Sequence, residues 1–140
     1  MIDGYDVVKP GLYDTVRYPP AGCIAVYDKS FELGLRFPLH PFARAILELL
    51  NITVAEFYPN AWGCITAFIL VSKGLGINPS MTAFRHIFRA RLCSSKTNGA
   101  GWVTLSHRRS FKLVRELPDS NKFLRLDSDT CIVGKVEILR

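Results

Sequence analysis

The chain has 140 residues, of which 49% are hydrophobic and 21% are charged, and its formal net charge is +6. This composition is typical of one globular domain with its own core, and it excludes a disordered tail. The longest apolar run, residues 64–71, is much shorter than the roughly 20 residues of a membrane-spanning helix, so no membrane partner is expected. The N-terminus lacks the pattern of a secretory signal, and we expect an intracellular location, in the nucleus or the cytoplasm.

The four cysteines lie far apart, and they form neither a Cys-x-x-Cys pair nor a zinc spacing with a histidine: Cys23, Cys64, Cys93 and Cys131. Buried, reduced thiols are the predicted state. We therefore expect no disulfide, no metal site and no cofactor.

The positive charge is concentrated in one third of the chain. Residues 81–125 contain ten lysines and arginines but only two acidic residues, whereas the segments on either side are close to neutral. Such a segment is typical of a surface that binds nucleic acid, and a solvated basic face is the alternative.

The first third of the chain predicts an arm and a short helix. Residues 1–19 mix glycine and proline with little periodicity, which indicates a flexible or extended arm. A helix is expected over residues 28–33, where Asp28 can accept hydrogen bonds from the first backbone N–H groups. Gly34 can then supply the left-handed residue that ends this helix.

A second helix is predicted over residues 41–50. Pro41 suits the first position of a helix because it has no N–H to leave unpaired, and His40 is expected to make a structural hydrogen bond before it. The apolar residues at helical spacing should form the buried face; they are Phe42, Ile46, Leu49 and Leu50.

The most apolar helix is expected next. Thr53 and Glu56 match a capping box. The helix over residues 61–73 is apolar on nearly all sides, and it should be the central buried helix.

A basic helix is predicted over residues 80–92, after the cap and first-turn proline of Asn78-Pro79. Its inward residues should be Phe84, Ile87, Phe88 and Leu92.

The last third of the chain has the pattern of strands. Residues 102–106 and 111–115 are rich in strand formers and predict a β-hairpin with Arg108 and Arg109 at its tip. A last strand is expected within residues 130–139. The predicted fold class is α+β, a mainly helical bundle followed by a C-terminal β-hairpin in the order of a winged helix-turn-helix.

This order predicts how nucleic acid would be bound. The helix over residues 80–92 would enter the major groove, and the hairpin tip would contact phosphate. Arginine offers planar donors to guanine edges and phosphates, and clustered cations release counterions when they bind. DNA and RNA are both open as ligands, and the predicted binding residues are Arg85, His86, Arg89, Arg91, Arg108, Arg109 and Lys112.

The sequence can also be compared with two other kinds of site, a groove for a partner protein and a catalytic site. Trp62, Trp102 and residues 37–42 could frame an apolar groove for a partner protein, with core packing as the alternative. A catalytic site is not expected, because Ser106 and His107 are neighbours on a predicted strand and point to opposite faces. The sequence also lacks a phosphate-cradling glycine motif.

The segments 20–27, 34–42, 59–62 and 75–80, with Phe84-Arg85 and Gly101-Trp102, resemble the transposase-like domain of plant gypsy-type transposons. The most specific is Gly-Leu-Arg-Phe-Pro-Leu-His-Pro-Phe at residues 34–42, and the resemblance extends over about residues 20–122. It implies descent from a plant retroelement, and it brings no established catalytic residues. The expected division is an arm at 1–19, this domain at 20–122 and a diverged or truncated tail at 123–140.

A transposase needs spaced carboxylates on an RNase H-like scaffold that holds two metal ions. Residues 81–125 contain only two acids and the first half is predicted to be helical, so we expect no enzyme. The expected function is non-catalytic binding of nucleic acid through residues 81–125. The alternatives are a protein-interaction or assembly module, with other retroelement or host proteins as partners, and a degenerate element product without a selected function.

Overall fold

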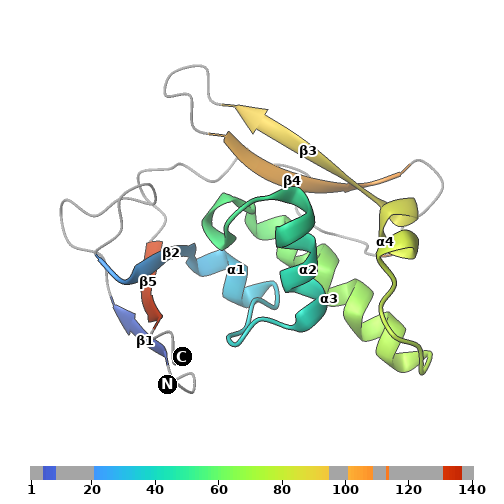
Figure 1. The fold of residues 1–140 in the computed structure, drawn as a ribbon, viewed down its shortest axis with the longest axis horizontal. Helices are drawn as coiled ribbons and strands as arrows, with labels where there is room; N and C mark the ends of the chain where they lie inside the picture. The colour runs from blue at the N-terminus through green and yellow to red at the C-terminus, as the bar shows by residue number, and fades with distance from the viewer. Residues whose placement is uncertain (1–4, 9–20, 95–100, 109–112, 114–130, 137–140) are drawn as a thin grey trace.

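The computed structural model describes residues 5–8, 21–94, 101–108, 113 and 131–136. These residues form a mixed α+β fold, as predicted, with a helical layer between a hairpin and a small sheet (Figure 1). In chain order the elements are β1 (Tyr5–Val8), β2 (Cys23–Tyr27), α1 (Asp28–Glu32), α2 (Pro41–Leu50), the 3-10 helix η1 (Val54–Glu56), α3 (Pro59–Gly74), α4 (Met81–Ile87), β3 (Phe88–Ser94), β4 (Gly101–His107) and β5 (Cys131–Val136).

Helix α2 has the predicted bounds because local signals set both of its ends. His40 Nδ1 accepts a hydrogen bond from the Phe42 N–H at 3.1 Å, and Pro41 occupies the first turn. Asn51 adopts the left-handed conformation that ends the helix, with φ at 52°. The structural role predicted for His40 is therefore confirmed.

The buried face of α2 is rotated from the prediction, away from Leu49 and toward Leu47. Leu47 is buried with Ile46, whereas Leu49 is 53% exposed. The core-facing stripe is centred on Ile46, and Leu49 lies at its outer edge. Leu49 is consequently available at the surface of the helical layer.

Helix α3 is the central helix, as predicted, but its last turns leave the core. Trp62, Ile65 and Phe68 are buried, whereas Leu70 and Val71 are 60% and 42% exposed. Before α3, the Glu56 carboxylate accepts the Thr53 N–H at 2.7 Å, which is the carboxylate half of the predicted capping box.

The prediction of one helix over residues 80–92 is wrong at both ends. Ser80, not Asn78, caps α4, since its Oγ accepts the Ala83 N–H at 3.3 Å. The helix then ends at Ile87, and the chain continues directly into β3. Helix α4 therefore has only seven residues.

Strand β3 explains why the helix stops. Apolar residues at positions 88, 90 and 92 alternate with Arg89 and Arg91, which is the period of a strand as well as part of a helical pattern. As a strand, residues 88–94 pair with β4 along their whole length, and this pairing supplies their backbone hydrogen bonds. Leu92, predicted to face inward, is 73% exposed as a result.

The described hairpin joins β3 to β4, a pairing that was not predicted. β3 and β4 pair antiparallel, from Phe88 opposite His107 to Ser94 opposite Gly101. The predicted pairing of residues 102–106 with 111–115 lies outside the described residues, because only residue 113 of the second range is described. Arg108 directly follows β4, whereas Arg109, the other residue of the predicted tip, lies outside the described residues. The predicted long recognition helix is not reproduced.

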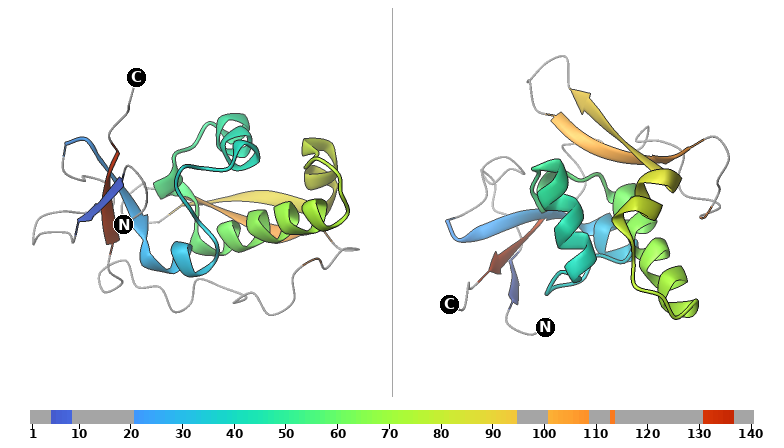
Figure 2. Two further views of the ribbon diagram at one scale, coloured as in Figure 1. Left: turned by 90° about the horizontal axis from the view of Figure 1, so that it is seen from below. Right: turned by 45° about the vertical axis from the view of Figure 1, so that its right-hand side comes forward.

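The second sheet joins three segments that are distant in the sequence. Its strand order is β1-β5-β2, with β5 antiparallel to both neighbours. The predicted last strand is confirmed as β5, and β1 lies within the segment predicted as an arm. Figure 2 shows this sheet at the end of the molecule away from α4.

The thiol of Cys64 lies inside the core, where burial raises its pKa from 9.0 to about 12. Cys23 and Cys93 are half-buried free thiols. The prediction of buried, reduced thiols is thus met at Cys64, whereas Cys23 and Cys93 are free but only half-buried and the side chain of Cys131 lies outside the described residues.

The buried thiol predicts a loss of stability at high pH. The unfolded chain releases this proton near pH 9 and the folded chain only near pH 12, so the free energy of unfolding should fall between these values. At pH 10 the loss should be about 1.4 kcal/mol. Urea unfolding at pH 8 and pH 10 measures it, and Cys64→Ala should lack this component; an equal pH dependence in both proteins would contradict the assignment.

Candidate nucleic-acid interface

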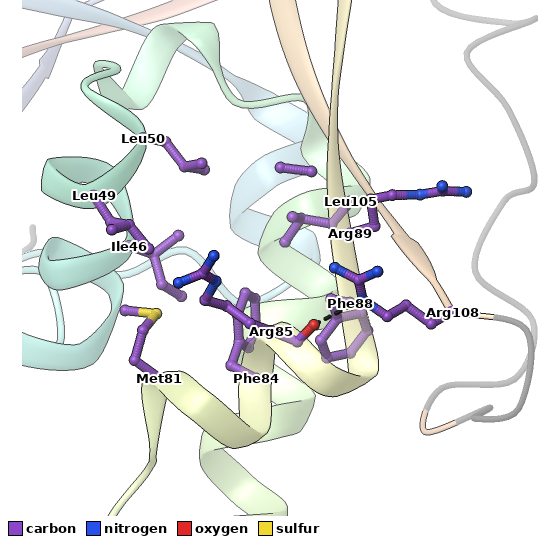
Figure 3. Close-up of a pocket in the computed structure, with 11 residues that line it drawn as sticks. Ile46, Leu49, Leu50, Met81, Phe84, Arg85, Phe88, Arg89, Leu105 and Arg108 are labelled. Carbon is purple, nitrogen blue, oxygen red and sulfur yellow. Dashed lines mark hydrogen bonds between the residues drawn. The ribbon is translucent and has the colours of Figure 1, made fainter.

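Three of the predicted arginines meet where α4 turns into β3 and where β4 ends (Figure 3). Arg85 lies in the last turn of α4, Arg89 is the second residue of β3, and Arg108 directly follows β4. All three are exposed and line one groove. We call these three residues, together with His86, the basic corner.

Arg108 holds this corner together. Its backbone N–H donates to the Ile87 carbonyl at 2.8 Å, and its Nε donates to the Arg85 carbonyl at 2.7 Å. Both bonds satisfy carbonyl groups at the C-terminus of α4, the end of a helix at which a cation is favourable. One part of the Arg108 side chain therefore has a structural role, while its Nη groups have no partner among the described residues.

The groove beside the basic corner has a volume of about 350 Å³ and an apolar floor. Phe84 and Phe88 form the base of this floor, with ring centroids 5.0 Å apart. The other apolar lining residues come from α2, the start of α4 and the hairpin; they are Ile46, Leu49, Leu50, Met81, Ala90 and Leu105. We call these eight residues the apolar floor.

A second, more open hollow extends the site to His86. It is lined by Thr82, Arg85, His86 and Arg108, and its volume is about 450 Å³. Two arginines are common to both hollows, so the groove and this hollow form one continuous basic surface.

The remaining predicted residues extend from the corner or cannot be placed. Arg91 is exposed and lies two positions beyond Arg89 on the same face of β3. Arg109 and Lys112 lie outside the described residues. The structure thus brings together four of the seven predicted residues and places a fifth nearby.

The charges of the corner are not neutralised by carboxylates in the described part of the chain. Among the described residues, an ion pair joins Lys29 to Glu32 at 2.6 Å, and both of these residues belong to α1. The acids whose side chains are described are Asp28, Glu32, Glu48 and Glu56, and none of them lines either hollow. An anionic ligand would therefore meet guanidinium groups that no described carboxylate neutralises.

Of the two interpretations of the aromatic residues, core packing is confirmed for Trp62 and Phe42. Trp62 is 2% exposed and Phe42 is 8% exposed, so both belong to the core. Trp102 is half-buried against Tyr58, with ring centroids 6.1 Å apart. The groove that does exist is lined by other residues, and sequence reasoning missed it because Leu49 and Leu50 were assigned to the core.

The described residues also bear on catalytic and membrane roles. Ser106 and His107 are adjacent in β4, opposite Arg89 and Phe88, and so lie on opposite faces of the hairpin. Among the described residues, no group of three or more His, Cys, Asp or Glu side chains could hold a metal ion. No helix within the described ranges is long and apolar enough to cross a membrane.

Comparison with known proteins identifies the family of the central region. No curated protein and no solved structure matches the chain. Residues 24–92 match the family model described as "Putative gypsy type transposon", a shorter range than the predicted 20–122. The match runs from β2 into β3 and includes Arg85 and Arg89. Residues 24–92 therefore belong to this gypsy-type transposon family, and the chain contains a domain derived from such an element.

Proposed function

We propose that this domain binds nucleic acid through the basic corner, without catalysing a reaction. The main support is that Arg85 of α4, Arg89 of β3 and Arg108, which follows β4, all line one groove. The guanidinium group is planar and presents paired N–H donors, which match the oxygens of a phosphate. Binding also releases the counterions that surround the phosphates, which adds to the affinity.

A purely structural role accounts for only part of this arrangement. Arg108 caps α4 through its Nε, and its position follows from that bond. Arg85 and Arg89 have no side-chain partner among the described residues, and both are exposed. Their gathering at one groove, without a described carboxylate, is what supports a bound anion.

The test neutralises the two arginines that have no structural bond. In Arg85→Gln/Arg89→Gln, the affinity for a labelled oligonucleotide should fall about tenfold at moderate salt. The slope of log affinity against log salt should decrease by about 1.4 to 1.8, because two phosphate contacts are lost. Fluorescence anisotropy at several salt concentrations measures both values.

The matched control is Arg44→Gln/Lys73→Gln. Both residues are exposed, neither lines the groove or the adjoining hollow, and the net charge changes by the same amount. This variant should bind nearly as well as the native protein. Equal losses in the two variants would show that binding depends on general charge, and no salt-dependent binding by the native protein would reject the proposal.

A protein-interaction or assembly role is the second candidate. It is favoured by exposed apolar side chains at the end of α3 and the turn that follows, which are Leu70, Val71, Leu75 and Ile77. Light scattering over a range of protein concentrations tests assembly: a mass that rises with concentration supports it, and a constant monomer mass opposes it. Plant origin and a nuclear or cytoplasmic location are proposed with either function, on the basis of the family.

A further inference from the structure

The apolar floor has no role in holding a phosphate. Guanidinium groups at the rim suffice for that purpose, yet the groove between them is lined by eight apolar residues. The part of this floor that is open to solvent includes Leu49, which is 53% exposed, and Met81, which is half-buried, whereas the rings of Phe84 and Phe88 are buried. A ligand that covers it must combine an anionic part with a flat apolar part.

We infer that the groove takes an unpaired nucleobase, and hence that the ligand is single-stranded nucleic acid. This inference rests on the proposed function, because the phosphates of the same strand must bind the basic corner. Exposed bases stack on apolar side chains and on the planes of arginine guanidinium groups. Figure 3 shows the Arg85 guanidinium reaching toward the α2 side of the groove, where Ile46 and Leu49 lie.

A duplex fits this site less well. Its bases are paired and stacked, and moving one of them into a groove costs a few kcal/mol. Reading the major groove would need a projecting helix, but α4 has seven residues, buries Phe84 and continues directly into β3. In a single strand the bases are free to turn toward the floor while the phosphates stay at the rim.

Strand β3 offers a path for the rest of such a strand. Arg89 and Arg91 lie on one face of β3, at alternate positions that are about 6.8 Å apart in a strand. This spacing is comparable to one nucleotide of an extended single strand, so the two side chains can contact successive phosphates. DNA and RNA share this chemistry, and both are included in the test.

The experiment compares oligonucleotides of about 12 nucleotides, a length within the usual range of single-strand sites, by anisotropy with the full chain. The probes are oligo(dT), oligo(U), the oligo(dT)·oligo(dA) duplex, and oligo(dT) with abasic central positions. At least one of the intact single strands should bind about tenfold more tightly than the duplex. The abasic strand keeps every phosphate, and its binding should be weaker than that of oligo(dT) by about fivefold or more because the stacked base is lost.

A variant of the floor links this loss to the groove. Leu49→Ser removes an exposed apolar contact and should bring the affinity for oligo(dT) close to that for the abasic strand. Leu70→Ser is the control, since Leu70 is similarly exposed but lies outside the groove. This control should retain the preference for intact bases.

The outcomes separate this inference from the proposed function. Duplex binding as tight as single-strand binding, or equal binding of the intact and abasic strands, would overturn the inference; if that binding still depends on salt and on Arg85 and Arg89, the proposed function stands. No salt-dependent binding to any probe would reject both. A preference for single strands that Leu49→Ser removes and Leu70→Ser retains supports the base-binding groove.

Discussion

Replacing Trp62 by alanine should lower the free energy of unfolding by about 3 to 5 kcal/mol, the usual cost of removing a large aromatic side chain from a core. Trp62 is 2% exposed and meets the Phe57 ring edge to face, with centroids 5.6 Å apart. The substitution would leave a cavity at the start of α3 that its neighbours fill only in part. Urea unfolding followed by circular dichroism measures the loss.

A second substitution at this position separates packing from polarity. The Trp62 Nε1–H is buried and has no hydrogen-bond partner among the described residues, so the indole gains nothing there from its polar atom. Trp62→Phe keeps an aromatic ring against Phe57 and removes the unpaired donor. It should cost clearly less than Trp62→Ala. Equal costs would contradict the packing assignment, and a native melting curve for Trp62→Ala would place the side chain at the surface.

The helices were predictable where the signals that start and end them are local. Pro41 and His40 fix the start of α2, and Gly34 ends the turn after α1 in a positive-φ conformation. Each signal acts over a few residues, and it depends little on what the rest of the chain does. The start of α3 at Pro59, two residues before the expected position, follows the same rule.

The change from α4 to β3 was not predictable in this way. The sequence Phe-Arg-Ala-Arg-Leu at residues 88–92 fits the outer end of a helix and also fits a strand with alternating faces. The choice depends on β4, which supplies hydrogen bonds from residues 101–107. Tertiary pairing therefore overrides local propensity here, and the β3–β4 hairpin was missed for the same reason.

The arginines of the candidate site were predicted from the sequence, whereas its apolar floor was not. Arg85 and Arg89 are close in the sequence, and the basic segment that contains them was visible from composition. The apolar floor takes Ile46, Leu49 and Leu50 from α2, more than thirty positions earlier. An exposed leucine on an amphipathic helix looks the same in the sequence as a buried one, so only the packing of α2 against α4 and β3 reveals the groove.

Replacing Gly34 by alanine should destabilise the protein by about 2 to 5 kcal/mol, because two separate costs add. The backbone of Gly34 has a φ of 108°, a conformation that costs a residue with a Cβ about 1 to 2 kcal/mol. A Cβ at this position would also lie 2.7 Å from Thr66 Cγ2 and 2.8 Å from Thr66 Cβ, which forces overpacking worth about 1 to 3 kcal/mol.

Gly74→Ala is the matched control for this prediction, since Gly74 lies at the end of α3 and a Cβ there would meet nothing within 4 Å. Alanine restricts the unfolded chain at such a site, so this variant should be unchanged or more stable by up to about 1 kcal/mol. Thermal unfolding of both variants measures the contrast. If Gly34→Ala melts like the native protein, residue 34 does not press against α3, and the close approach of α1 to α3 is wrong. If only Gly34→Ala is destabilised, and by more than the roughly 2 kcal/mol that its backbone conformation accounts for, that approach is a tight contact which glycine alone permits.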